Sequence, residues 1–352
     1  MNPIERGLRR LDRRQQRHRV PAFVVGVVKK YGDDNGGILA SSLAHSAFVS
    51  VFPLLLILVT ILGIVASGNP TAYQDVHQAV DKQFPVIGAQ LMGQNGIHEL
   101  HRSSVIGLIA GLLGLLWGAS GLAQSGLFTM AQVWNLPGPA RPGYVPRLGR
   151  CLLFTGVLGT GMIVTTGLSA LGTFGQHLLV FVALAEILAA VANAGLYFIG
   201  FRVLTPKGVP SRNLVAGAIV GGVAWTVLQT LGVFVVHHFL HSGSVYGIFF
   251  GTVLGLVAWL YLGVQVTVYA AEINVVLARH LWPRSIIQPP LTEADRSSMA
   301  LQALQNQRRE EQDVTVSFND RPRGERADPQ TPRTPAQISP PADPGGPPAR
   351  GS

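Results

Sequence analysis

Six long apolar runs constrain the fold of this chain more than any other feature. They lie at about residues 38–67, 104–122, 151–174, 178–201, 214–236 and 245–277. An α-helix needs roughly 20 residues to cross about 30 Å of hydrocarbon, and each run is close to or above that length. A helix also satisfies its own backbone groups in lipid, and the alternating pattern of a membrane barrel is absent from the sequence. The sequence therefore predicts an all-α integral membrane protein with six transmembrane helices.

Charged residues make up only 13% of the chain and are concentrated outside these runs. Lysine and arginine resist translocation, so their positions predict which loops stay in the cytoplasm. The segment through Lys30 carries nine of the 27 and the chain beyond residue 278 carries ten, whereas the segment 68–103 carries two. This distribution predicts that both termini are cytoplasmic. It also explains the high pI without a nucleic-acid partner, because the basic residues do not lie on a folded domain.

The runs divide the chain into three parts. Residues 1–36 form a basic cytoplasmic segment, residues 37–278 the transmembrane domain, and residues 279–352 a tail that holds 12 of the 23 prolines. We expect the tail to be a disordered cytoplasmic segment, since it lacks apolar periodicity. In the first part, the arginines between Arg9 and Arg19 predict anionic inner-leaflet lipid as a partner of the basic segment. The apolar residues at helical spacing predict an interfacial amphipathic helix beside Lys29 and Lys30. They are Val20, Val24, Val27 and Tyr31. A plain topogenic signal is the alternative.

Two acidic residues, Glu186 and Glu272, fall inside the apolar runs. A charge at bilayer depth costs at least about 2.5 kcal/mol, so both are candidates for function. Asn193 and Tyr197 share the helix face of Glu186. This polar stripe predicts either a substrate pathway or a buried structural hydrogen-bond network, and the sequence does not choose between them.

Glu272 lies near the cytoplasmic end of the last run. Tyr261 and Gln265 lie on its helix face, which becomes polar at this end, and we include all three in the predicted pathway. Arg202 lies at a matching depth at the end of the fourth run. We therefore predict an ion pair between Arg202 and Glu272.

Glycines recur at four-residue spacing inside the runs, where they let helix backbones approach closely. They are Gly107, Gly111, Gly114, Gly118, Gly217, Gly221, Gly247, Gly251 and Gly255. We interpret them as helix-packing positions. The same faces are suited to self-association, so a homo-oligomer is a possible assembly.

Enzymatic motifs are scarce in this sequence. Nucleotide-binding loops, nucleophile elbows and paired catalytic carboxylates are absent, and Cys151 is the only cysteine. His237, His238 and His241 have spacing compatible with zinc but lack a carboxylate or cysteine partner. We therefore predict no metal site, no cofactor and no enzymatic activity.

Several segments together resemble the YihY/BrkB family of bacterial inner-membrane proteins, formerly labelled ribonuclease BN. They are Leu43–Leu56, Trp117–Leu122 followed by Trp134-Asn135, Phe201–Pro206, Gly217-Ala218 before Trp225, and segments within Val245–Asn274. His45 stands where a tyrosine is usual in the family. The resemblance implies a six-helix membrane fold in the bacterial plasma membrane and a part in envelope integrity. It does not imply nuclease activity here, because the His-x-His-x-Asp-His ligand cluster of zinc nucleases is absent.

Combined with the polar stripe, the resemblance favours a non-enzymatic protein that moves or organises a lipid or amphiphile of the envelope. A membrane scaffold, whose polar groups only hold the bundle together, is the first alternative. A membrane-anchored enzyme is the second, and it would need a catalytic site within the segment 68–103.

Overall fold

A computed structural model of the chain describes residues 3–68, 104–141, 143–171, 179–205, 208–239 and 245–318. These residues form helices joined by short turns, and they contain no strand. The helices are α1 (Pro3–Arg17), α2 (Arg19–Asp33), α3 (Gly36–Gly68), α6 (Ser104–Val133), α7 (Tyr144–Leu171), α8 (Leu179–Leu204), α9 (Val215–Phe239), α10 (Val245–Ala278) and α11 (Glu293–Gln305). Two short 3-10 turns, η2 (Gly138–Ala140) and η4 (Ser211–Leu214), precede α7 and α9.

A long helix occurs at each of the six apolar runs. Four of them contain windows that are long and apolar enough to cross a membrane. The windows are Gly36–Pro53, Ile187–Leu204, Ser211–Gly232 and Val253–Ala278. The described residues thus support an all-helical protein with four candidate membrane-spanning helices, in α3, α8, α9 and α10.

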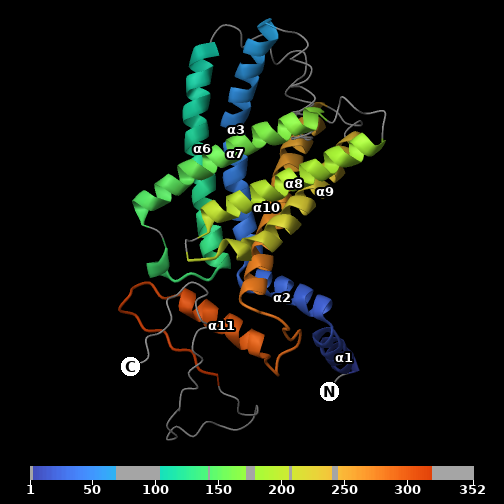
Figure 1. The fold of residues 1–352 in the computed structure, drawn as a ribbon, viewed down its shortest axis with the longest axis vertical. Helices are drawn as coiled ribbons and strands as arrows, with labels where there is room; N and C mark the ends of the chain where they lie inside the picture. The colour runs from blue at the N-terminus through green and yellow to red at the C-terminus, as the bar shows by residue number, and fades with distance from the viewer. Residues whose placement is uncertain are drawn as a thin grey trace, which may run out of the picture.

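Helices α3 and α6 lie side by side along much of their length (Figure 1). Their backbones approach closely at two of the predicted packing glycines. A Cβ atom added to Gly114 would lie 3.2 Å from the Pro53 ring, and one added to Gly118 would lie 3.0 Å from the Ser50 Cα atom. Pro53 itself lies inside α3.

Helices α8, α9 and α10 form a second closely packed group. A Cβ atom on Gly217 would lie 2.0 Å from the carbonyl oxygen of Ala270, and one on Gly221 would lie 2.9 Å from the Tyr197 ring. Gly217 and Gly221, like Gly114 and Gly118, thus lie where neighbouring helices approach closely. Of the other predicted glycines, Gly111 is buried and Gly255 is half-buried, whereas the surroundings of Gly107, Gly247 and Gly251 lie outside what the structure describes.

The chain after α10 differs from the prediction. Residues 279–318 are ordered, and α1, α2 and α11 gather at one end of the helical bundle (Figure 1). Leu281 and Leu301 are buried, and Thr292 begins α11 with a capping box to Asp295. The prediction of disorder from residue 279 is therefore wrong for this stretch. Its order comes from the burial of these leucines and from polar contacts with distant segments, which apolar periodicity does not reveal. Residues 319–352 lie outside the described part.

A helix, α2, lies where the sequence predicts an interfacial one, and its apolar residues divide between two environments. Val20 and Val24 are exposed, whereas Val27 is buried and Tyr31 stacks on Tyr269 at 4.0 Å between ring centroids. Lys30 is also completely buried. One side of α2 therefore packs against the bundle and carries a charged residue into it.

Candidate functional site: a buried charge cluster

A buried lysine at the end of α2 meets two carboxylates from separate parts of the chain. Lys30 Nζ lies 3.5 Å from Glu272 Oε2 and also pairs with Asp34 in the turn between α2 and α3. The exposed fractions of the three side chains are 0%, 0% and 2% for Lys30, Glu272 and Asp34. Buried charges are costly unless they are paired, so these contacts are tightly constrained.

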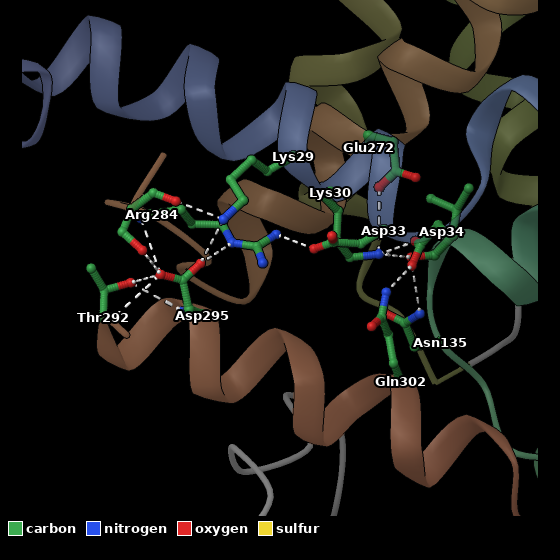
Figure 2. A network of polar contacts seen from close by, with 12 residues as sticks. Lys29, Lys30, Asp33, Asp34, Asn135, Glu272, Arg284, Thr292, Asp295 and Gln302 are labelled. Atoms are coloured by element: carbon green, nitrogen blue, oxygen red, sulfur yellow. Dashed lines mark hydrogen bonds and ion pairs between the residues drawn. The ribbon is translucent and has the colours of Figure 1, made fainter. Parts of the chain in front are cut away.

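Amide groups complete this arrangement around Asp34 (Figure 2). Asn135 donates from Nδ2 to Asp34 Oδ1 at 3.1 Å, and Gln302 in α11 donates to the same oxygen at 3.3 Å. Lys30 also donates to the carbonyl oxygen of Val133 at 3.1 Å. We call Lys30, Asp34, Glu272, Asn135 and Gln302 the Lys30 cluster. It joins α2, the end of α6, α10 and α11.

Two asparagines place the polar groups of the Lys30 cluster. Asn35 and Asn135 adopt φ values of 55° and 47°, the left-handed region that asparagine tolerates better than most residues. Asn135 ends α6, with the Leu136 N–H donating to the Ala131 carbonyl oxygen at 2.9 Å. This reversal of the chain brings the Asn135 amide to Asp34.

The charges within the Lys30 cluster do not balance. One ammonium group faces two carboxylates, and neither oxygen of Glu272 accepts a hydrogen bond within the described part of the chain. Asp34 makes more stabilising contacts than Glu272, because it accepts hydrogen bonds from the amides of Asn135 and Gln302 and also pairs with Lys30. Glu272 is therefore the less stabilised of the two carboxylates.

A second group of ion pairs adjoins the first, and we call it the Arg284 cluster (Figure 2). Arg284 Nη1 lies 2.5 Å from Asp33 Oδ2, and Arg284 Nε lies 2.9 Å from Asp295 Oδ1. Lys29 completes the cluster at 3.3 Å from Asp295. Burial alone would raise the pKa of Asp295, but hydrogen bonds from Ser285 and Thr292 outweigh it and hold the pKa below the usual 3.8.

The predicted ion pair between Arg202 and Glu272 is wrong. The structure pairs Glu272 with Lys30, whereas Arg202 donates to the carbonyl oxygen of Val209 at 3.2 Å. The prediction named Arg202 because it is the basic residue at the end of α8, at the same depth in the predicted membrane domain as Glu272. The depth of residues along their helices does not predict that α2 packs against the bundle and brings Lys30 inside it.

The predicted polar stripe of α8 takes part in contacts between helices. Asn193 donates to the Thr226 hydroxyl at 3.0 Å, linking α8 to α9. The hydroxyls of Tyr197 and Thr267 are 3.0 Å apart, linking α8 to α10. Glu186 lies in α8, but its side chain is outside what the structure describes.

Tyr261 and Gln265 lie near Tyr31, the α2 residue whose ring stacks on Tyr269 of α10. Burial raises the pKa of Tyr31, and the groups around its hydroxyl include Gln265, Tyr261 and Tyr269. The Tyr31 hydroxyl is buried and has no hydrogen-bond partner of normal geometry in the described residues. The polar end of the predicted α10 face therefore packs against α2.

Sequence reasoning missed Lys30, Asp34 and Asn135 as members of the site. The one available signal was Trp134-Asn135, which was recognised only as a family segment. Trp134 is 1% exposed and its carbonyl oxygen accepts from Arg279 at 3.1 Å. The histidines considered for zinc stay untested, because the side chains of His237 and His238, and the whole of His241, lie outside the described part.

The long apolar helices, with charges gathered at one end, indicate a multi-pass all-helical membrane protein. The family model described as Virulence factor BrkB matches residues 27–290, which is most of the chain. The chain therefore belongs to the BrkB family, which confirms the resemblance found in the sequence. No curated protein and no solved structure matches the chain. The family match includes Lys30, Asp34, Asn135 and Glu272 but ends before α11.

Proposed function

We propose that the chain is a six-span protein of the bacterial inner membrane with both termini in the cytoplasm. Two observations support this topology. A long helix occurs at each of the six apolar runs, and α1, α2 and α11 lie together at the end of the bundle where the basic segments meet (Figure 1). An even number of crossings places both ends of the chain on one side. The lysines and arginines at this end favour the cytoplasm.

We further propose that it is a non-enzymatic protein that moves a lipid or amphiphile of the envelope and so contributes to envelope integrity. The Lys30 cluster carries this proposal. It lies at one end of an apolar bundle and leaves a buried carboxylate without full compensation, an arrangement typical of proton relays in membrane proteins.

Proton exchange at Glu272 gives the cluster two states. A proton taken up by Glu272 balances the cluster, since Lys30 and Asp34 then neutralise each other. Release of that proton to water leaves a net negative charge among apolar helices, which favours separation of the helices and entry of water. A proton gradient would in this way alternately close and open the cytoplasmic end.

The scaffold alternative is favoured by a specific observation. Asn193 and Tyr197, the predicted pathway residues, are both engaged in hydrogen bonds between helices. In a scaffold these bonds and the Lys30 cluster would hold the bundle together without any movement of lipid.

A reconstitution experiment separates the two functions. Transbilayer movement of labelled bacterial lipids is measured in proteoliposomes that hold the wild type, Glu186→Gln or Glu272→Gln. Glu310→Gln serves as the matched control, because Glu310 is exposed and outside both clusters. Movement by the wild type and the control that is reduced in Glu272→Gln supports transport. Wild-type protein that moves none of several lipid classes above empty liposomes favours the scaffold.

The N-terminal helices provide a second lipid contact in this proposal. Leu8, Leu11, Val20 and Val24 are exposed apolar residues on α1 and α2, and arginines accompany them. Such helices bind the surface of anionic membranes through both features. We propose that this face rests on the inner leaflet.

A further inference from the structure

A cavity of about 670 Å³ adjoins the Lys30 cluster on the α11 side. Asp33, Asp34 and Ile38 line it from the turn between α2 and α3, and Phe128 and Gln132 line it from α6. Arg141 follows η2, and the stretch 305–308 at the end of α11 forms the opposite wall. The cavity therefore lies between the membrane helices and the C-terminal segment.

The two carboxylates of the cavity are already occupied. Asp33 is paired with Arg284, and Asp34 with Lys30. Asp34 Oδ1 also accepts hydrogen bonds from Asn135 and Gln302. These acidic groups therefore offer little free capacity for a cation, in spite of their negative charge.

The groups of the cavity that remain available to a ligand are hydrogen-bond donors. Arg141 lines the cavity, and its terminal nitrogens make a single long hydrogen bond within the described residues, to the Leu136 carbonyl oxygen at 3.5 Å. The Arg141 guanidinium lies over the Phe128 ring, 5.9 Å from its centroid, which holds its plane in place. Arg308 also lines the cavity and is exposed, and within the described residues its guanidinium forms no hydrogen bond or ion pair.

The opening of the cavity is apolar on the side of the membrane helices. Ile38 is 70% exposed and Phe128 is 47% exposed. Ile38 also lies at the start of the membrane-spanning window of α3, which begins at Gly36. In the proposed topology this is the depth of the phospholipid headgroups, at the edge of the hydrocarbon.

We propose that this cavity binds the phosphate group of an anionic amphiphile, with Arg141 and Arg308 as the ligands and Ile38 and Phe128 against its apolar part. Guanidinium groups present paired N–H donors whose geometry matches phosphate oxygens. The inference rests on the proposed membrane placement and names the chemical class of the lipid. It does not require that the lipid is moved.

The C-terminal segment supplies one wall of this site. Residues 305–308 lie beyond the family match, which ends at residue 290. They are fixed by a hydrogen bond from Gly138 N to the Gln307 carbonyl oxygen at 2.8 Å and by one from Asn135 to Gln305 at 2.9 Å. Arg308 is therefore held at the cavity by contacts of its neighbours with Asn135 and with the first residue of η2.

Equilibrium binding to the purified full-length protein in detergent tests the site. The probes are short-chain phosphatidic acid, inorganic phosphate, and the matching diacylglycerol, which has the chains without the phosphate. We expect phosphatidic acid to bind and diacylglycerol to bind far more weakly. Loss of one charge-assisted contact should weaken binding of phosphatidic acid by about tenfold in Arg141→Gln, and by severalfold in Arg308→Gln. Arg212→Gln, an exposed arginine away from the cavity, should leave binding unchanged.

Three outcomes decide the matter. Inorganic phosphate that binds as tightly as phosphatidic acid, with the same loss in the variants, supports a phosphate site for a soluble ligand. Binding of phosphatidic acid that both variants retain overturns the proposal and assigns the lipid to another surface, such as the N-terminal helices. Absence of binding to the wild type overturns it as well. Because Arg308 is exposed, Arg308→Gln tests the site even where Arg141→Gln fails to fold.

The result is separable from lipid movement. A site confirmed by binding, in a protein that moves no lipid, refutes transport and leaves the phosphate site intact. Lipid movement by the wild type together with unaltered binding in both variants refutes the site and leaves transport intact.

Discussion

Replacement of Lys30 by methionine removes the only cation of the Lys30 cluster and leaves Glu272 and Asp34 buried together. Methionine occupies a similar volume, so the change removes charge more than it removes packing. Breaking a buried ion pair by removing one partner costs about 3–5 kcal/mol. A change of that size lowers the melting temperature of a large domain by on the order of 10 °C.

The partial exposure of the neighbouring lysine provides the control. The Lys29 side chain is 23% exposed and pairs with Asp295 at 3.3 Å. Asp295 is buried, but it keeps the Arg284 guanidinium and the hydroxyls of Ser285 and Thr292 as partners when Lys29 is replaced. Lys29→Met should therefore lower the melting temperature far less than Lys30→Met does. Thermal unfolding of the purified variants in one detergent at neutral pH measures both.

A double-mutant cycle isolates the contact between Lys30 and Glu272. Glu272→Gln alone removes one of the two carboxylates of the Lys30 cluster. In the double variant Lys30→Met/Glu272→Gln, Glu272 no longer contributes the uncompensated charge that Lys30→Met alone leaves buried. The two changes should therefore be non-additive, with a coupling energy of about 1–3 kcal/mol. Additive changes in stability, or equal losses in Lys30→Met and Lys29→Met, would refute the interpretation of this cluster.

Two further predictions follow from packing and from pKa. Gly217→Ala places a Cβ atom 2.0 Å from the carbonyl oxygen of Ala270, so thermal unfolding should show a loss of about 1–3 kcal/mol, whereas Gly121→Ala, with open space around it, should show none. The lowered pKa of Asp295 stabilises the folded state above pH 3.8, and this stability is lost as the pH falls toward the folded-state pKa. Melting temperatures measured across acidic pH should therefore fall less steeply in Asp295→Asn than in the wild type, and a slope that does not change would contradict the assigned hydrogen bonds.

The helices were predictable from the sequence because their cause is local. A long apolar run without charges must form a helix that satisfies its own backbone in lipid, and glycines at four-residue spacing reveal where helices touch. Glu272 was found in the same way, since a carboxylate in an apolar run is costly wherever its partner lies.

The partners of Glu272 were not predictable, because they depend on how distant segments are placed. Lys30 reads as one more basic residue of a cytoplasmic segment until α2 is packed against α10. Likewise, the composition after residue 279 is that of a disordered tail. Its order rests on Arg284 and Asp295, whose partners include Asp33 and Lys29 at the opposite end of the chain.

Contacts between the two ends of the chain impose an order on its biosynthesis. Asp12 accepts a hydrogen bond from the Ile286 N–H across 274 residues. Lys30 pairs with Glu272, which lies in α10, the last long helix to be synthesised. In the proposed topology, Lys29 and Lys30 are therefore exposed charges that hold the N-terminal segment in the cytoplasm while the earlier helices enter the membrane. Lys30 is withdrawn from water only after α10 has been synthesised and inserted. A charge that first orients the chain in the membrane thus ends in the interior of the folded protein, and the end of the bundle that holds the Lys30 cluster forms last.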